Sequence, residues 1–299
     1  MQKKANYILR SAYKSNIIVE QETIKVKRGN SMEKTLLGFI GAGNMATAII
    51  NGIVSTETLS PAQIFIFDIN AEKCSYFKEM GIQIAPSASE LVASCDVIIF
   101  AIKPQNFEEV LAEVKEQATR NKLFISIAAG ISTNYIRKGL ACDSPIIRTM
   151  PNTPLLLGQG ATAMCRSSGV TDSMYEMAET FFSSCGTVIE LKEEQMNAVI
   201  SVNGSSPAYV YLFAKAMLDN AVKQGIEKEI ALPLIVQTFI GSAGMLMYSG
   251  KTPDELIEMV SSRGGTTLKA LEYFYDHNFE KIVDEAMLAC TERAKELGK

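Results

Sequence analysis

The sequence has no tryptophan and a single histidine, His277, in 299 residues. A histidine-based catalytic triad and a histidine-rich metal site are therefore poorly supported. No CxxC pair occurs among the six cysteines, which stand far apart (Cys74, Cys95, Cys142, Cys165, Cys185 and Cys290). This spacing argues against a zinc site and a disulfide framework, and we expect no metal and a reducing, cytoplasmic location.

Positive charge is not in excess either, because 29 Lys and Arg face 33 Asp and Glu, for a net charge of −4. Such a chain lacks the electrostatic footprint of a nucleic-acid-binding protein. Its 47% hydrophobic and 21% charged residues are ordinary for globular proteins. The length suffices for two domains or one large domain.

Residues 1–31 are more basic than the rest and contain no continuous apolar stretch or small-residue cleavage site, which excludes a secretory signal. A transit peptide is one interpretation, although the segment is not enriched in Ser or Arg. We favour a translated leader before a start at Met32, because the codons for Lys27-Arg28-Gly29 can resemble a bacterial ribosome-binding site. We expect residues 1–31 to be no part of the fold.

Two long runs, residues 195–214 and 230–250, contain no charge. The second run is long enough to span a bilayer. However, proline, glycine and polar residues interrupt both runs. We therefore interpret them as helices that are apolar on most faces and buried in a core or a subunit interface, and we expect no membrane span.

Short apolar runs alternate with helical stretches in the first half of the chain. Strands are predicted at residues 35–40, 64–67, 97–101, 123–127 and 146–150, and helices at 47–54, 70–80 and 106–117. Buried strands separated by helices indicate an α/β fold with a doubly wound parallel sheet.

A GxGxxA loop follows the first predicted strand and opens a helix (Gly41, Ala42, Gly43, Asn44, Met45 and Ala46). This context is typical of a dinucleotide site, where Gly41 permits the tight turn, Gly43 lets a pyrophosphate approach and Ala46 keeps the helix close to the strand. Asp68 ends the second predicted strand, where a carboxylate accepts from ribose hydroxyls. The alternatives are a plain strand-to-helix turn and, for Asp68, a turn or cap before Asn70.

After a last predicted strand at residues 187–191, the pattern is helical, with helices at 194–223, 229–247, 253–260, 266–275 and 279–297. We therefore divide the chain into a dinucleotide-binding domain, residues 32–190, and an all-helical dimerisation domain, residues 191–299. The first two helices are too apolar to face water, so we expect at least a dimer.

Six phrases in order then carry a resemblance: GFIGAGNMA (38–46), AIKPQ (101–105), SIAAG (126–130), RTMPNTP (148–154), GSSPAY (204–209) and GGTT (264–267). Together they resemble pyrroline-5-carboxylate reductase, the last enzyme of proline synthesis. The resemblance implies a dinucleotide-binding domain and a helical domain that swaps into a dimer, with dimers often built into rings. It also implies hydride transfer from NADH or NADPH to the C=N carbon of 1-pyrroline-5-carboxylate, giving L-proline.

This chemistry needs little acid–base machinery, because a protonated cyclic imine is already electrophilic. Backbone N–H groups of the glycine loop at Ser262, Gly264, Gly265 and Thr266 can cradle the substrate carboxylate at a helix N-terminus. By resemblance, Thr267 points its hydroxyl at the ring nitrogen. The alternative is an ordinary glycine loop with Thr266 as N-cap.

The resemblance places three further residues near the substrate. Glu193 lies near the substrate amine, or is simply a first-turn helix acid. Asn203 and Ser205 belong to a helix interruption that opens backbone near the substrate, or that only kinks the helix at Pro207. The residues implied to line the ribose and nicotinamide are Ala101, Ile102, Lys103, Pro104, Ala128 and Ala129.

Asp68 is followed by no arginine within its turn, and Lys73 is the nearest cation. We therefore expect NADH to be used at least as well as NADPH. Two alternatives remain: another imine or β-hydroxyacid reductase of the same two-domain build, and a non-catalytic regulatory relative. The absence of lysine from residues 194–203 counts against the β-hydroxyacid enzymes, and the retained GGTT and GSSPAY phrases count against loss of catalysis.

Overall fold

The computed structural model describes residues 32–298, so the expectation for residues 1–31 lies outside the described residues. Internal contacts divide the chain into two compact units. The sheet unit reaches to Met196 and includes the chain again from Glu296, and the helical unit spans Asn197–Lys295.

One eight-stranded sheet forms the centre of the sheet unit, in the order β3-β2-β1-β4-β5-β6-β7-β8. Strands β1 to β6 run parallel, β7 is antiparallel to β6, and β8 is parallel to β7. The strands are β1 (Leu37–Ile40), β2 (Ile64–Phe67), β3 (Gln83–Ile84), β4 (Val97–Phe100), β5 (Leu123–Ser126), β6 (Ile146–Met150), β7 (Gly160–Arg166) and β8 (Gly186–Glu190).

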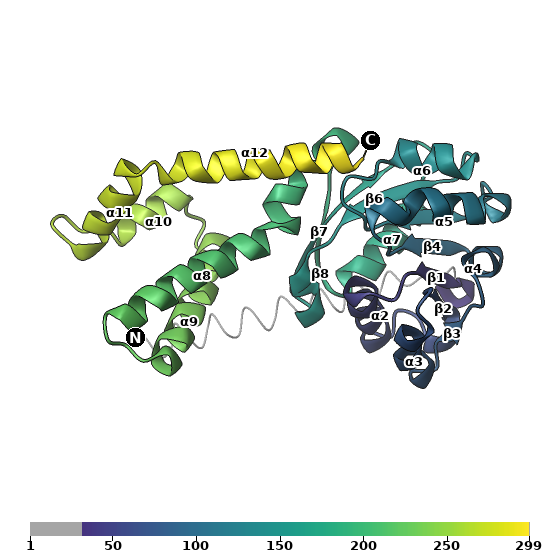
Figure 1. Ribbon diagram of the computed structural model, residues 1–299, viewed down its shortest axis with the longest axis horizontal. Helices are drawn as coiled ribbons and strands as arrows, with labels where there is room; N and C mark the ends of the chain where they lie inside the picture. The colour runs from purple at the N-terminus through teal and green to yellow at the C-terminus, as the bar shows by residue number, and fades with distance from the viewer. Residues whose placement is uncertain (1–31, 299) are drawn as a thin grey trace. The chain divides into compact units, whose positions relative to one another are not determined.

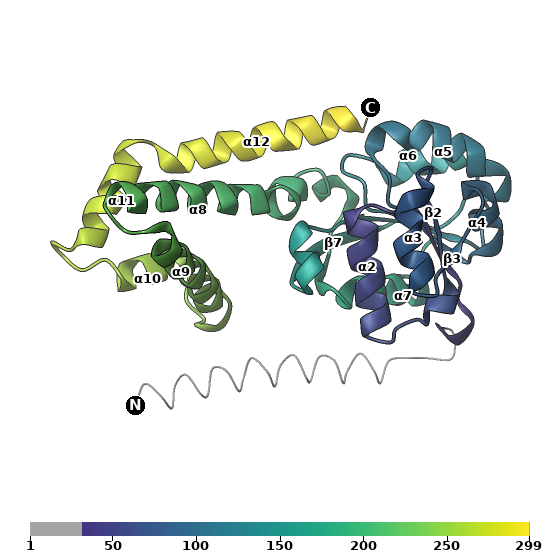
Figure 2. The same ribbon diagram turned by 60° about the horizontal axis from the view of Figure 1, so that its bottom comes forward.

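Helices cover both faces of this sheet, as a doubly wound fold requires. Helices α2 (Asn44–Ser55), α3 (Ala71–Glu79) and α7 (Asp172–Ser183) pack on one face (Figure 1). Helices α4 (Ala88–Ser94), α5 (Phe107–Val114) and α6 (Thr133–Leu140) pack on the other (Figure 2). Each face has its own apolar core, and β1 and β4 are buried throughout because both faces are covered.

The register of the central strands brings the predicted cofactor residues to one edge. Ile40 at the end of β1 pairs with Phe67 of β2 and with Phe100 of β4. The residues that follow these strand ends, Gly41, Asp68 and Ala101, therefore share the carboxyl edge of the sheet. Ligands of open α/β sheets bind at this edge.

Two strands were not predicted from the sequence. Strand β3 has two exposed residues, too few to produce a pattern. Strand β7 reads GATAMCR, in which small residues replace the usual β-branched run. The helix predicted at residues 194–223 is also divided, into a 3-10 turn at Glu193–Gln195, a π-helical turn at Ile200–Gly204 and helix α8.

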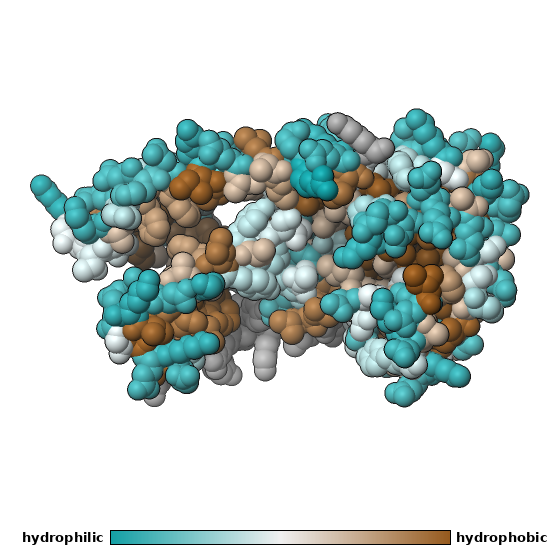
Figure 3. All heavy atoms as spheres, in the orientation of Figure 1, coloured by the Kyte–Doolittle hydropathy of each residue, from teal (hydrophilic) through white to brown (hydrophobic). Residues whose placement is uncertain are grey.

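The helical unit consists of α8 (Ser206–Lys223), α9 (Lys228–Tyr248), α10 (Pro253–Met259), α11 (Thr266–Asp276) and most of α12 (Phe279–Leu297). Phe213 of α8 lies among partly exposed aromatic rings, with ring centroids 6.2 to 6.5 Å from those of Phe239, Phe274 and Phe279. Few of its side chains are buried, and apolar ones are exposed along α8 and α9 (Figure 3). A unit that exposes so much apolar surface needs a further partner to cover it.

Helix α9 is the one helix among the described residues that is long and apolar enough to cross a membrane by length and composition. Only 11% of its apolar window is buried within this protomer. Composition alone does not separate a membrane span from an apolar helix covered by a partner subunit.

Candidate active site

The first position of the glycine loop, residue 41, accepts only glycine. Gly41 has φ +107°, and a Cβ there would lie 2.5 Å from the carbonyl oxygen of Ala101. Its N–H donates to the carbonyl of Phe67 at 2.7 Å. Gly41 therefore fixes the loop against both neighbouring strands, which holds the start of α2 at the carboxyl edge.

Gly43 differs, because among the described residues nothing lies within 4 Å of the position its Cβ would take. Gly43 is the N-cap of α2, and no side chain of the described chain caps this helix end. In the first turn Asn44 is exposed and Met45 is half-buried, and Ala46 is fully buried against the sheet. This arrangement fits a pyrophosphate, which needs close backbone approach and a positive helix end.

Asp68 ties this loop to the turn after β2. Its Oδ2 accepts from the N–H of Ala42 at 2.8 Å, and its Oδ1 accepts from the N–H of Asn70 at 2.9 Å. Lys73 places its ammonium 3.7 Å from the same carboxylate. Asn70, rather than Asp68, caps α3 through its side chain. Asp68 thus serves as the turn residue before Asn70, which is the alternative that the sequence offered. Each of its oxygens also retains a lone pair for a ligand hydroxyl.

The remaining predicted cofactor residues follow β4 and β5 at the same edge. The N–H of Ala101 donates to Ile40, and Ile102 packs beside Gly41. Lys103 is exposed, and Pro104 begins a short 3-10 turn. In the loop after β5, Ala128 donates its N–H to the Ser126 hydroxyl, and Ala129 follows it with partial exposure.

The predicted substrate residue Glu193 lies in the sheet unit, where three donors hold it. Its Oε1 accepts from Arg148 at 3.1 Å and from the N–H of Thr133 at 3.3 Å, and its Oε2 accepts from the Cys165 thiol at 3.2 Å. Arg148 stands beside Ser126, the last residue of β5. Glu193 is therefore more than a first-turn helix acid, because an ion pair with the buried Arg148 fixes its side chain.

In the helical unit, the second glycine-containing loop, residues 262–265, forms a turn that leads into α11. The N–H of Gly265 donates to the carbonyl of Ser262 at 2.9 Å, and Gly264 takes φ +75°. Gly265 is the N-cap, so the alternative of Thr266 as N-cap is wrong. A Cβ on Gly265 would collide with Ser262, which explains the glycine there. Thr266 and Thr267 form the first turn of α11.

A hollow of about 270 Å³ opens beside this helix start, and its lining includes Gly264, Gly265 and Thr266. No side chain of the described chain caps α11, so its first N–H groups remain available to an anion. The helix interruption is a π-helical turn that contains Asn203, and the Ser205 hydroxyl accepts from the Cys290 thiol of α12 at 3.3 Å. Pro207 lies in the first turn of α8.

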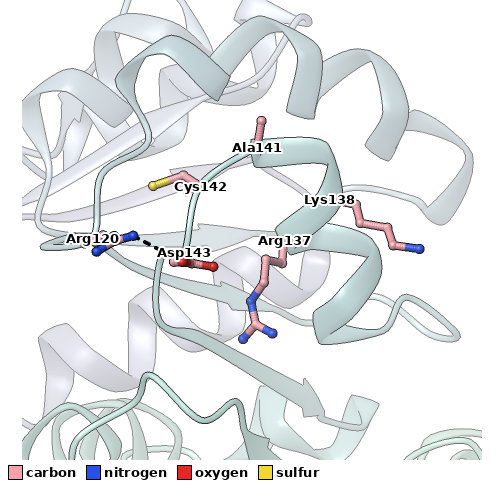
Figure 4. A pocket seen from close by; sticks show the side chains of 6 residues that line it. All are labelled: Arg120, Arg137, Lys138, Ala141, Cys142 and Asp143. Atoms are coloured by element: carbon pink, nitrogen blue, oxygen red, sulfur yellow. Dashed lines mark hydrogen bonds and ion pairs between the residues drawn. The ribbon is translucent and has the colours of Figure 1, made fainter.

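A second hollow, of about 450 Å³, lies in the sheet unit, where α6 meets the segments that precede β5 and β6 (Figure 4). Arg120 extends toward Asp143 there and pairs with it at 3.2 Å, while Arg137 and Lys138 occupy the last turn of α6. Cations at a helix C-terminus complement the helix dipole, which gives both side chains a structural reason. Within the described residues, no group of three or more His, Cys, Asp or Glu could hold a metal.

Sequence reasoning missed Arg148 and Cys165 as members of the Glu193 cluster. Arg148 was part of the RTMPNTP phrase, but nothing in the sequence connected it to a carboxylate 45 positions away. A buried arginine in an otherwise apolar strand was the available signal, because such a charge requires a partner.

Comparison with known proteins finds a matching family for each of the two parts of the chain. Residues 193–297 match the family described as pyrroline-5-carboxylate reductase dimerisation, and residues 36–130 match the family described as NADP oxidoreductase coenzyme F420-dependent. Pyrroline-5-carboxylate reductase of Escherichia coli K12 is 36% identical over 90% of this chain and 100% of its own length. The enzyme of Arabidopsis thaliana is 34% identical over 89% of this chain and 97% of its own length.

Solved structures of pyrroline-5-carboxylate reductases are also similar to this chain. Plasmodium falciparum pyrroline carboxylate reductase with NADP bound has a TM-score of 0.83 and 31% identity, over 90% of this chain and all of that chain. The Coxiella burnetii pyrroline-5-carboxylate reductase has a TM-score of 0.81 and 32% identity, over 89% of this chain and 99% of that one. The alternative reductases of the same build are not supported by these relationships. The chain belongs to the pyrroline-5-carboxylate reductase family.

Proposed function

We propose that this chain reduces 1-pyrroline-5-carboxylate to L-proline with hydride from NAD(P)H, and that the residues described above carry out the reaction. The observation that carries this proposal is family membership over nine-tenths of the chain, combined with a glycine loop whose geometry fits a dinucleotide. When bound, the reduced nicotinamide supplies the hydride. The protein supplies binding, orientation and electrostatics.

The cofactor site is proposed at the carboxyl edge of the sheet. Gly41, Ala42, Gly43, Asn44, Met45 and Ala46 would hold the pyrophosphate, and Asp68 would accept from the ribose hydroxyls. Ala101, Ile102, Lys103, Pro104, Ala128 and Ala129 would line the ribose and nicotinamide. Because Asp68 is a carboxylate, we propose that NADH serves at least as well as NADPH.

The substrate contacts are proposed on two sets of residues. Backbone N–H groups around Ser262, Gly264, Gly265 and Thr266 would hold the substrate carboxylate, and the Thr267 hydroxyl would reach the ring nitrogen. Glu193 would lie near the substrate amine, with Asn203 and Ser205 contributing from the helix interruption. These contacts fix the ring for hydride delivery, so the site does not require a histidine or cysteine.

The helical part of the chain, residues 193–297, carries the family's dimerisation domain, so the chain self-associates. We propose that α9 is covered by a second copy of this chain rather than by a membrane, because it lies inside that domain. The same proposal includes rings of dimers, a cytoplasmic location and domain limits at 32–190 and 191–299.

Two neighbouring threonines allow a matched test of the substrate assignment. Thr267→Ala removes the hydroxyl proposed at the ring nitrogen, and turnover should fall by up to about 100-fold, with the Kd for the cofactor unchanged. Thr266→Ala keeps the backbone contact and should leave turnover within about twofold. Equal kinetics for the two variants would contradict the assignment of Thr267.

A further inference from the structure

Glu193 is held more firmly than a carboxylate at the start of a short 3-10 turn would be by itself. Both of its oxygens accept hydrogen bonds, from a guanidinium, a thiol and a helix N–H. Its own side chain is 36% exposed, whereas the side chain of Arg148 is 3% exposed. One side of the carboxylate therefore faces a buried cation, while part of it remains open to solvent or a ligand.

The two side-chain donors come from directly opposed positions of an antiparallel strand pair. Arg148 of β6 and Cys165 of β7 are register partners. Opposed residues in such a pair project from the same face of the sheet. This register places the guanidinium and the thiol side by side, and they reach different oxygens of Glu193.

The thiol acts as the donor in its contact. Burial raises the pKa of the Cys165 thiol above its usual range, and the adjacent Glu193 carboxylate raises it further, so the sulfur keeps its proton. The Arg148 guanidinium needs a counter-charge because it is buried, and Glu193 provides one. The polar groups of this cluster thus satisfy one another in a single arrangement of the Glu193 side chain.

We propose that Arg148 and Cys165 are positioning residues that hold the Glu193 carboxylate in its working orientation. The inference rests on the proposed function, because it takes Glu193 as the group beside the substrate amine. A long glutamate side chain loses rotamer freedom when it binds a ligand, and donors that fix it beforehand reduce this loss. The benefit is expected in the apparent affinity for substrate and not in cofactor binding.

The first test uses Cys165→Ala, with Cys95→Ala as a control that removes another fully buried thiol from a helix end of the same unit. Cys165→Ala should raise the KM for 1-pyrroline-5-carboxylate about five- to tenfold and leave the KM for NADH unchanged. Cys165→Ser keeps a donor and should restore most of the loss, and Cys95→Ala should leave both KM values unchanged. Melting temperatures of all variants establish that each is folded.

The second test asks whether Cys165 acts through Glu193. In a Glu193→Gln background, Cys165→Ala should cause no further rise in substrate KM, because the oriented carboxylate is already gone. A full multiplicative rise in that background would overturn the inference, as would a Cys165→Ala enzyme with unchanged substrate KM alongside an impaired Glu193→Gln enzyme. If Glu193→Gln itself left the substrate KM unchanged, the substrate role of Glu193 would fail first, and this inference with it.

Discussion

Replacing Asp68 by serine separates the two roles that the structure gives to this carboxylate. Its oxygens hold the N–H groups of Ala42 and Asn70 at 2.8 and 2.9 Å, and the side chain is 11% exposed. Serine is neutral and shorter, so it cannot make both contacts. Asp68→Ser should therefore loosen the glycine loop and also remove the negative charge that a 2′-phosphate would meet.

The magnitudes follow from these contacts. One hydrogen bond to a charged acceptor contributes about 1.5 to 3 kcal/mol, so losing one of the two contacts should lower the melting temperature by about 3 to 12 °C. A phosphate charge about 5 Å from a carboxylate is repelled by about 1 to 3 kcal/mol, depending on the local dielectric. Removing Asp68 should thus raise kcat/KM for NADPH by roughly 5- to 150-fold. Activity with NADH should fall about tenfold as the ribose contacts are lost.

The assay is kcat/KM for both cofactors in the wild type, Asp68→Ser and Asp68→Asn. Asparagine keeps an acceptor oxygen but no charge, so it should shift cofactor preference with a smaller loss of stability. Glu72→Ser removes a nearby exposed carboxylate from the first turn of α3 and serves as the control. A strong NADPH preference in the wild type that Asp68→Ser leaves unaltered would refute this reasoning.

Three further predictions concern the loop, the helical unit and the N-terminal segment. Gly41→Ala should lower the melting temperature, because its Cβ would lie 2.5 Å from the Ala101 carbonyl oxygen. Gly43→Ala should keep the wild-type melting temperature but bind NADH at least about tenfold more weakly. Ile240→Asp on α9, where the isoleucine is 61% exposed in one protomer, should weaken the dimer by about 2 kcal/mol or more, measured by light scattering against concentration; an unchanged mass would contradict an α9 interface. A chain that starts at Met32 should match the full chain in melting temperature and activity, and a clear loss of either would show that residues 1–31 contribute.

Much of the sheet unit could be predicted because its strands are short and bounded by clear turns, and the central strands β1, β4 and β5 are buried on both faces. The second strand was predicted at residues 64–67, where the structure has it. Strand β7 was missed because its order comes from the long-range pairing of residues such as Thr149 with Met164, which no local pattern reports. Tertiary context decided its conformation.

The candidate site also has parts that follow from local sequence and parts that depend on long-range contacts. The loop at Gly41 and the position of Asp68 follow from local sequence, because a strand, a turn and a helix lie in succession. The partners of Glu193 come from 28 to 60 positions away in the chain, and only the folded sheet brings them together. The composition of α9 predicted a helix buried in a core or a subunit interface, whereas within one protomer many of its apolar side chains are exposed.

The most direct measurement is turnover of the purified full chain with 1-pyrroline-5-carboxylate and each nicotinamide cofactor. Oxidation of NADH or NADPH should match the L-proline formed, mole for mole, and Thr267→Ala should slow both signals together. A folded chain that binds NADH but forms no L-proline with either cofactor would contradict the proposed activity and would leave the non-catalytic alternative.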